Sequence, residues 1–150
     1  MAELTWDDKY STGVREIDDE HKELFDTLRE IDSAISRKAD AAETGAFLKK
    51  LTAATSKHFA DEEAMMHKTK YPGMTLHIAN HQRLMEKLGA FSARHSRDGA
   101  QLNQHALSFL RDWLLYHIEN DDTRYGDWLK DLVRKQGLAP KPKPALQQNA

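Results

Sequence analysis

Four segments of this chain carry apolar residues at alternating spacings of three and four. That period places the apolar side chains on one face of an α-helix, so each segment predicts an amphipathic helix with one buried stripe. We expect the first helix to begin near Ile17, the second to run over 41–67, the third to start after Pro72-Gly73, and the fourth to run over 102–132. Four such helices joined by short breaks predict an all-α fold, an up-down-up-down antiparallel four-helix bundle.

The two ends of the chain lack this period. Residues 1–16 predict an extended N-terminal segment, in which Trp6, Tyr10 and Val14 are expected to form an apolar lid over one end of the bundle. Residues 137–150 are rich in proline and lysine, so we expect a disordered C-terminal tail there. The bundle is therefore expected to form one domain over residues 1–136.

Polar residues interrupt the second and third stripes in pairs. His58 and Glu62 are four residues apart, and so are His77 and His81. On an α-helix, residues at this spacing lie one above the other on the same face, so each pair presents two metal-binding side chains in one direction. Burying such groups without partners costs several kcal/mol, which favours a shared metal ion between the facing pairs.

The first and fourth helices each add a histidine to the same interior. His21 lies on the first stripe and His117 on the fourth. The acid that accompanies His117 is ambiguous. Asp121 at i+4 is better aligned on an ideal α-helix, and Asp122 at i+5 faces inward only if the helix widens locally into a π-bulge. Geometry alone favours Asp121. Three histidines have no partner at ligand spacing and are expected in ordinary packing or at the surface: His67, His95 and His105.

Composition narrows the chemistry. The sequence has no cysteine, which excludes disulfides, zinc–thiolate sites, iron–sulfur clusters and thiol nucleophiles. A formal net charge of −2 at pH 7 argues against general nucleic-acid binding. The N-terminus has no leader pattern and no stretch is apolar enough to span a membrane, so we expect a cytoplasmic protein. Apart from Glu62, the acidic runs Asp18–Glu20 and Asp61–Glu63 are expected to face solvent.

The candidate ligands form an ordered series of motifs. They read His21 in I-D-D-E-H, His58-Phe59-x-x-Glu62, His77-x-x-x-His81 and His117-Ile118-x-x-x-Asp122. This series resembles the hemerythrin family, and the start W-x-x-x-x-S-x-G-V-x-x-I-D resembles its bacterial single-domain branch, the bacteriohemerythrins. The resemblance covers roughly residues 6 to 132. It selects Asp122 over Asp121, because the family pattern is H-I-x-x-x-D.

The resemblance implies a cofactor of two iron ions, a non-haem di-iron centre with an oxo or hydroxo bridge. The implied ligands are His77, His81 and His117 for one iron, His21 and His58 for the other, and Glu62 and Asp122 as shared carboxylates. The iron with two histidines then keeps one open position. The family places apolar residues over that position, and Leu24, Phe59 and Leu114 stand where such residues are expected.

The function implied by the resemblance is reversible O2 binding, as a carrier, a store or a sensor, without an enzymatic step. A histidine-rich ligand set supplies less negative charge than the carboxylate-rich sites of ferritin-like di-iron proteins, which favours O2 binding over O2 activation. Two alternatives use the same residues: a di-iron enzyme that reduces O2, NO or peroxide, and an interaction module whose metal is secondary. We expect small anions such as azide as further ligands, a soluble or membrane oxygenase as a candidate partner, and a monomer.

Overall fold

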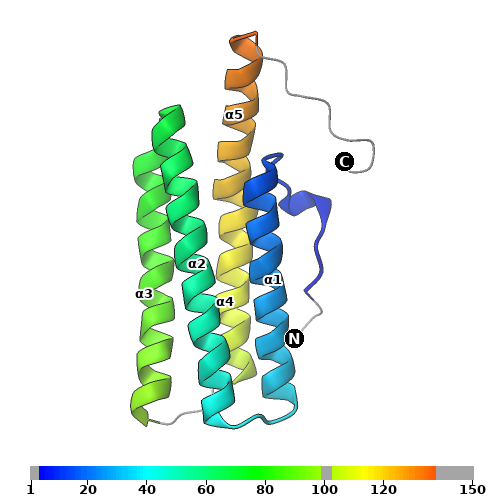
Figure 1. Ribbon diagram of the computed structural model, residues 1–150, viewed down its shortest axis with the longest axis vertical. Helices are drawn as coiled ribbons and strands as arrows, with labels where there is room; N and C mark the ends of the chain where they lie inside the picture. Colours follow the sequence, from blue (N-terminus) through cyan, green and yellow to red (C-terminus); the bar gives the residue numbers. More distant parts are fainter. Residues whose placement is uncertain (1–3, 99–102, 138–150) are drawn as a thin grey trace.

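The computed structural model describes residues 4–98 and 103–137. Helices α1, α2 and α3 form three arms of a bundle, and α4, η2 and α5 run on as one continuous fourth arm (Figure 1). The elements are the 3-10 helix η1 (Asp8–Tyr10), α1 (Arg15–Ser36), α2 (Ala41–Thr69), α3 (Met74–Asp98), α4 (Gln104–His117), the π-helix η2 (Ile118–Asp122) and α5 (Thr123–Lys135). The predicted all-α, up-down-up-down bundle is confirmed.

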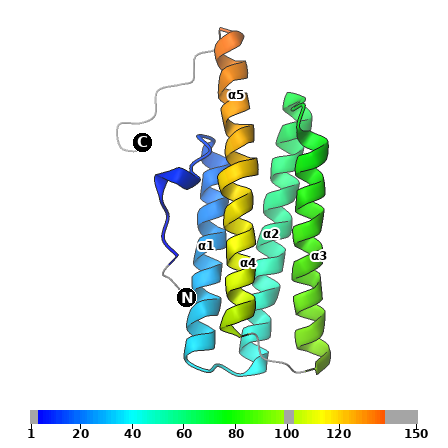
Figure 2. The same ribbon diagram turned by 180° about the vertical axis from the view of Figure 1, so that it is seen from behind.

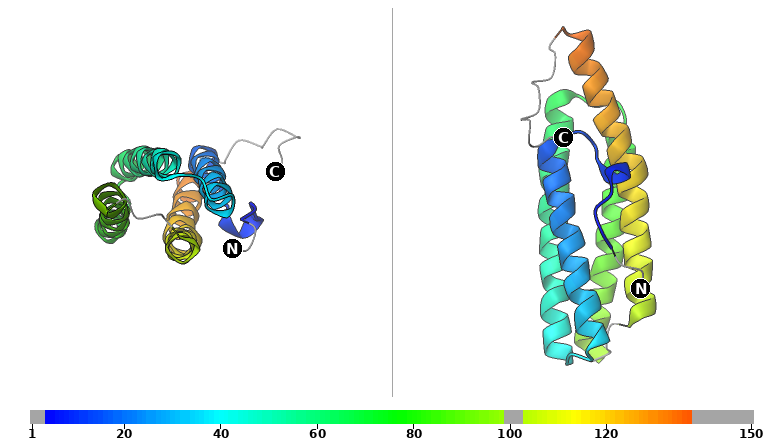
Figure 3. Two further views of the ribbon diagram at one scale, coloured as in Figure 1. Left: turned by 90° about the horizontal axis from the view of Figure 1, so that it is seen from below. Right: turned by 90° about the vertical axis from the view of Figure 1, so that its right-hand side faces the viewer.

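The four arms stand side by side and alternate in direction, as the two opposite views show (Figures 1 and 2). Seen along the bundle, they surround a common interior (Figure 3, left). Helix α5 extends beyond the ends of α2 and α3 (Figure 1). Within the described residues, no helix is long and apolar enough to cross a lipid bilayer.

Short, specific turns connect the first three helices. After α1, Lys38 adopts the left-handed conformation (φ 56°) and the Ala39 N–H donates to the Ala34 carbonyl at 2.9 Å, which ends the helix. Asp40 then caps α2 by accepting a hydrogen bond from the Glu43 N–H at 2.9 Å. Helix α2 ends in the same way at Lys70 (φ 59°), just before the proline and glycine that precede α3. These turns hold each helix antiparallel to the next.

The N-terminal segment lies along the side of the bundle. It runs lengthwise beside α1 and the fourth arm (Figure 3, right), so the predicted lid over one bundle end is wrong. The rings of Trp6 and Tyr10 pack on Phe25 of α1, with ring centroids 5.5 and 5.1 Å away. Only the third member of the expected lid, Val14, packs near the upper end, against the cluster that contains Ile17.

Asp18 and Gly126 hold this segment in place. The Asp18 carboxylate accepts hydrogen bonds from the Thr12 N–H and from the Ser11 hydroxyl, both at 2.8 Å. Gly126 lets the segment cross α5 at close range, because a Cβ at that position would lie 2.1 Å from the Thr12 carbonyl oxygen. Asp18 therefore holds the N-terminal segment against the start of α1, which corrects the expectation that it faces solvent.

The bundle interior has three levels. The lower level, toward the α1–α2 turn, is apolar, and its residues are 4% exposed or less: Leu28, Ile31, Leu48, Leu51, Leu84, Leu88, Leu107 and Leu110. The middle level contains the predicted metal ligands. The upper level is a separate cluster built around Ile17, Met66, Tyr71 and Tyr125. Residues 138–150 of the predicted tail lie outside the described part of the chain, and the domain boundary at 136 stays a prediction.

Candidate metal centre

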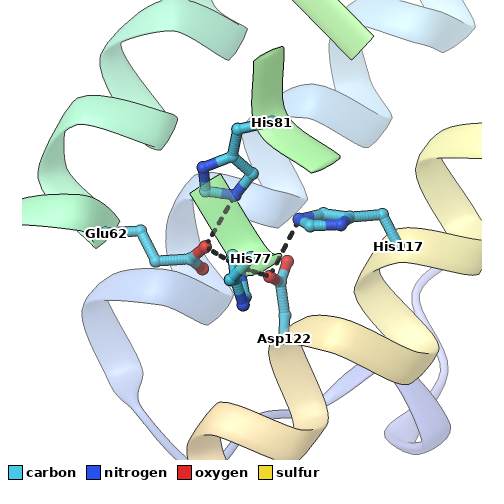
Figure 4. A group of neighbouring side chains, drawn as sticks. All are labelled: Glu62, His77, His81, His117 and Asp122. Carbon is cyan, nitrogen blue, oxygen red and sulfur yellow. Dashed lines mark hydrogen bonds and ion pairs between the residues drawn. The ribbon is translucent and has the colours of Figure 1, made fainter. Parts of the chain in front are cut away.

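All seven predicted ligands meet in the middle of the bundle, and each is 5% exposed or less. They come from every arm: His21 from α1, His58 and Glu62 from α2, His77 and His81 from α3, His117 from α4 and Asp122 from η2. Figure 4 shows five of them, with the Glu62 and Asp122 carboxylates lying between the imidazole rings. Hydrophobic burial of the surrounding stripes brings these polar side chains together.

The side chains divide into two groups that could each hold a metal ion. The groups are Glu62, His77, His81, His117 and Asp122, and His21, His58, Glu62 and Asp122. The two carboxylates belong to both groups. Each donor group therefore contains two shared acids, and the groups differ in having three histidines or two.

Each shared carboxylate directs one oxygen to each group. Glu62 Oε1 lies 2.6 Å from His77 Nε2, whereas Glu62 Oε2 lies 3.7 Å from His58 Nε2. Asp122 Oδ1 lies 2.9 Å from His77 Nε2, whereas Asp122 Oδ2 lies 2.8 Å from His21 Nε2. This division of oxygens is the arrangement needed for two carboxylates to bridge two ions.

The spacing of the donor atoms fits six-coordinate cations. Ligand atoms about 2.1 Å from one ion and at right angles to each other lie about 3 Å apart. His21 Nε2 and His58 Nε2 are 3.0 Å apart. His81 Nε2 lies 3.0 Å from Glu62 Oε1, and His117 Nε2 lies 3.1 Å from Asp122 Oδ1. The imidazole nitrogens and the carboxylate oxygens are therefore spaced so that they could bind the same metal ions.

Several of these buried atoms lack a hydrogen-bond partner among the described residues. They are His81 Nε2, His117 Nε2, Glu62 Oε2 and both carboxylate oxygens of Asp122. A buried polar atom without a partner costs about 1–3 kcal/mol, and more if it is charged. Metal cations would satisfy all of these atoms at once. The residues present thus fit a pair of metal ions with nitrogen and oxygen ligands.

A π-helix decides which acid faces the interior. Ile118–Asp122 is π-helical, and this extra width turns Asp122 inward, where it is 0% exposed. The preference for Asp121 from ideal α-helical geometry is therefore wrong, because that argument assumes regular helix spacing. Asp121 instead contacts the opposite side of a ligand ring, where its Oδ2 accepts a hydrogen bond from His117 Nδ1 at 2.7 Å.

Two further carboxylates contact the outer nitrogens of histidines in the cluster. Glu20 Oε1 accepts from His58 Nδ1 at 2.8 Å, and Glu63 Oε2 accepts from His81 Nδ1 at 2.7 Å. Such bonds fix the ring orientation and the tautomer that leaves Nε2 free to bind metal. Both residues lie in acidic runs that were expected to face solvent, so their contacts with the histidines correct that expectation. Their sequence positions could have indicated this role, because Glu20 directly precedes the ligand His21 and Glu63 directly follows the ligand Glu62.

The electrostatics of the cluster show strong coupling between acids and imidazoles. Burial disfavours the charged form of His77, but the adjacent carboxylates of Asp122 and Glu62 outweigh it and raise the pKa of His77 to about 9. The pKa of His117 rises to about 10, because Asp122 and Asp121 outweigh its burial. Burial also opposes ionisation of Asp122. The imidazoles of His117, His21 and His77 outweigh this burial and hold the pKa of Asp122 well below its usual range. The buried carboxylates of Glu62 and Asp122 therefore strongly favour positive charge beside them.

An aromatic ring lies against the cluster, and further apolar side chains belong to the same hydrophobic core as this ring. The Phe59 ring stacks on His81 with centroids 3.7 Å apart and planes 5° apart, and it also lies 5.8 Å from the rings of His58 and His117. Leu24 and Leu114 belong to the same hydrophobic cluster as Phe59. So does Ile118, 0% exposed, a pocket candidate that the sequence analysis did not single out. Phe59 therefore covers the imidazole of His81, whereas the position of Leu24 and Leu114 over the centre stays a prediction.

The remaining histidines lie apart from the cluster. His67 and His105 are exposed, and His95 Nε2 donates to the Ala41 carbonyl at 2.8 Å. Neither of the two donor groups includes any of them. These positions agree with the expectation of surface or ordinary packing roles.

Comparison with known proteins gives one consistent family. Residues 12–129 match the model of the hemerythrin HHE cation binding domain. Bacteriohemerythrin of Methylococcus capsulatus is 32% identical over 86% of this chain and 98% of its own, and myohemerythrin of Sipunculus nudus is 32% identical over 80% and 88%. A solved structure of wild-type hemerythrin superposes with a TM-score of 0.79 at 31% identity, covering 84% of this chain and 97% of that one. The chain therefore belongs to the hemerythrin family.

Proposed function

We propose that this protein binds O2 reversibly at a non-haem di-iron centre held by the seven buried ligands. Membership of the hemerythrin family supports both the di-iron cofactor and O2 binding. The observation that carries the ligand assignment is the division of the Glu62 and Asp122 oxygens between a three-histidine and a two-histidine group. The bound irons would supply the redox-active position to which O2 attaches.

A count of the donors supports the two-histidine side as the position at which O2 would bind. With one bridging oxygen, the group of His77, His81 and His117 has six donors, and the group of His21 and His58 has five. Six donors complete an octahedron, so only the second group keeps an open position. Small anions such as azide would compete for the same position. A cytoplasmic location, a monomeric state and an oxygenase partner remain predictions.

The chain's own residues prepare this position. Glu20 orients His58 through its outer nitrogen, and Lys57 Nζ in turn holds Glu20 Oε2 at 2.9 Å. Phe59, Leu24 and Leu114 form an apolar wall that keeps water away from bound O2. A dry wall without an acid or base favours release of O2 unchanged, which suits a carrier, a store or a sensor better than an enzyme.

The test compares one ligand histidine with one exposed histidine. Purified protein should hold two irons per chain and show an optical change on O2 binding that reverses when O2 is removed. His77→Ala should lose at least one iron, because only four of the five protein ligands in its group then remain. His67→Ala changes an exposed histidine on the neighbouring helix α2, and this variant should keep both irons. Equal iron content in the two variants would contradict the ligand assignment.

A further inference from the structure

An aromatic cluster connects one histidine of the centre to the protein surface. The Tyr71 ring lies 6.4 Å from the His77 ring, measured between centroids, at an angle of 78°. Tyr71 also contacts Trp128 of α5 at 5.1 Å and Tyr125 at 4.8 Å. The rings of Tyr125 and Trp128 stack at 6.2 Å with planes 21° apart. Tyr71 therefore adjoins His77, and Tyr125 and Trp128 adjoin Tyr71, so ring contacts connect Trp128 to His77 through Tyr71.

Burial falls along this cluster from the interior outward. Tyr125 is 0% exposed and Tyr71 is 8% exposed, whereas Trp128 is only partly buried. Its position on α5 places Trp128 at the upper level of the bundle, above the metal centre. The ordering gives one continuous path from His77 through Tyr71 to the surface at Trp128.

The other two tryptophans provide an internal comparison. Trp6 and Trp113 are partly buried like Trp128. Trp6 contacts Tyr10 and Phe25, and Trp113 contacts Phe109. In the described part of the chain, neither of these tryptophans is connected to a histidine of the centre through a ring that it contacts, whereas Trp128 contacts Tyr71, which contacts His77. Only Trp128 combines surface access with a connection to a ligand.

The two sides of the centre also differ in redox character. Phe59, Leu24 and Leu114 resist one-electron oxidation, so the apolar wall insulates the proposed O2 position. Tyrosine and tryptophan are among the side chains most easily oxidised by one electron. The His77 side is therefore the side on which an oxidising equivalent can leave the centre.

We propose that Tyr71 and Trp128 form a one-electron relay that carries oxidising equivalents away from the centre when hydrogen peroxide reacts there. This rests on the proposed di-iron function. One H2O2 takes up two electrons and two protons and becomes two waters. Tyr71 supplies one electron and its phenol proton, and Trp128 supplies one electron and its indole proton, which leaves two neutral radicals. Oxidation of the histidine ligands is thereby avoided.

The experiment treats the oxidised, iron-loaded protein with one equivalent of hydrogen peroxide. Electron paramagnetic resonance of rapidly frozen samples should show a tyrosyl or tryptophanyl radical, and peptide mass spectrometry should find oxygen added to Trp128 in preference to Trp6 and Trp113. Tyr71→Phe should lower oxidation of Trp128 several-fold and shift damage to His77. Trp113→Phe is the matched control and should change neither readout. Protein loaded with zinc should show no radical.

Two results would overturn the relay. One is oxidation of the three tryptophans in equal measure, which indicates oxidants diffusing in solvent. The other is undiminished Trp128 oxidation in Tyr71→Phe. If Tyr71→Phe fails to fold, Trp128→Phe answers the same question, because the radical should then remain on tyrosine. Iron content and the O2-dependent spectrum are measured on the same samples. A sample with both irons and reversible O2 binding but no radical refutes the relay alone, and a sample without iron refutes the proposed function.

Discussion

Below the metal centre, the bundle interior consists of leucine and isoleucine side chains that are 4% exposed or less. At the centre itself, five imidazoles and two carboxylates are buried to the same degree. Removing an apolar side chain of this size from water stabilises the fold by about 1.5–3 kcal/mol. Removing an unpaired polar or charged group from water costs several kcal/mol. Equal burial therefore has opposite energetic consequences in the two regions.

The contacts of the lower region are complete without a metal, whereas the middle region contains buried polar atoms without hydrogen-bond partners in the described part of the chain. Hydrogen bonds within the centre give some of the buried polar atoms a partner, such as the bond between His77 Nε2 and Glu62 Oε1 at 2.6 Å. The Asp122 oxygens still lack hydrogen-bond partners among the described residues. Metal binding supplies what the chain leaves incomplete, and its free energy adds to folding.

The largest expected effect follows from iron removal. Chelation should lower the melting temperature markedly and loosen η2 and α5, while the lower ends of α1 and α2 stay helical, because only the centre loses partners. Circular dichroism melting measures the first effect. Hydrogen exchange measures the second, with slow amide exchange expected to persist around Leu28 and to be lost around Asp122. Identical melting curves with and without iron would contradict the comparison.

Leu28→Ala tests the apolar region by itself. Leu28 is 1% exposed, so its truncation should cost roughly 2–5 kcal/mol of unfolding free energy. The same loss is expected with and without iron, because Leu28 has no role at the centre. Denaturant unfolding in both states measures it, together with iron content, which should not change. A loss confined to the iron-loaded protein would mean that the two regions are not energetically separable.

Leu114→Ala makes the same chemical change beside the centre. Leu114 is 4% exposed, so the stability cost is again roughly 2–5 kcal/mol. Unlike Leu28→Ala, it should also admit water and anions to the proposed O2 position. The oxy form should then oxidise faster, and azide should bind the ferric form faster, both followed by stopped-flow absorbance. If only stability falls, Leu114 acts in packing and the pocket lies elsewhere.

Regular helix geometry predicted the apolar region and part of the metal centre from the sequence. The apolar region follows from helical period alone, since Leu24, Leu28 and Ile31 repeat at the spacing that buries one face. The helix pairs His58/Glu62 and His77/His81 also follow from regular geometry, because residues at i and i+4 share a face of any α-helix. Regular repeats are predictable because each residue constrains the next.

The parts that regular helix geometry could not predict depend on departures from that geometry or on contacts between helices; for Asp122, only the resemblance to the hemerythrin family selected the correct acid. The π-helix at Ile118–Asp122 changes which acid faces inward, and no single residue type announces it. Glu20 reaches His58 across the α1–α2 interface, which periodicity within one helix cannot reveal. The N-terminal segment followed a seam between helices rather than a bundle end for the same reason. A local widening of the helix determines the first, and contacts between distant segments determine the other two.

The smallest expected effect concerns the acid that ideal geometry favoured. Asp121 accepts from His117 Nδ1 at 2.7 Å and from the Asn80 amide at 2.8 Å, so it orients a ligand without facing the centre. Asp121→Asn keeps the shape but removes the negative charge, and loss of such a contact typically lowers metal affinity about 10–100-fold. Competition with a chelator measures this, and unfolding in the absence of iron should change little.

The matched control is Asp131→Asn, which removes an acid from the surface of α5. Asp131 pairs with Lys135 at 2.9 Å, and its side chain is 41% exposed, so the change should leave iron affinity as it is. If Asp121→Asn behaves like this control, the hydrogen bond to His117 has no bearing on the metal. If instead Asp121→Asn abolishes iron binding as fully as loss of a ligand, Asp121 is itself a ligand. The π-helical assignment of Asp122 would then be wrong, and the comparison between the two regions would have to be drawn around a different acid.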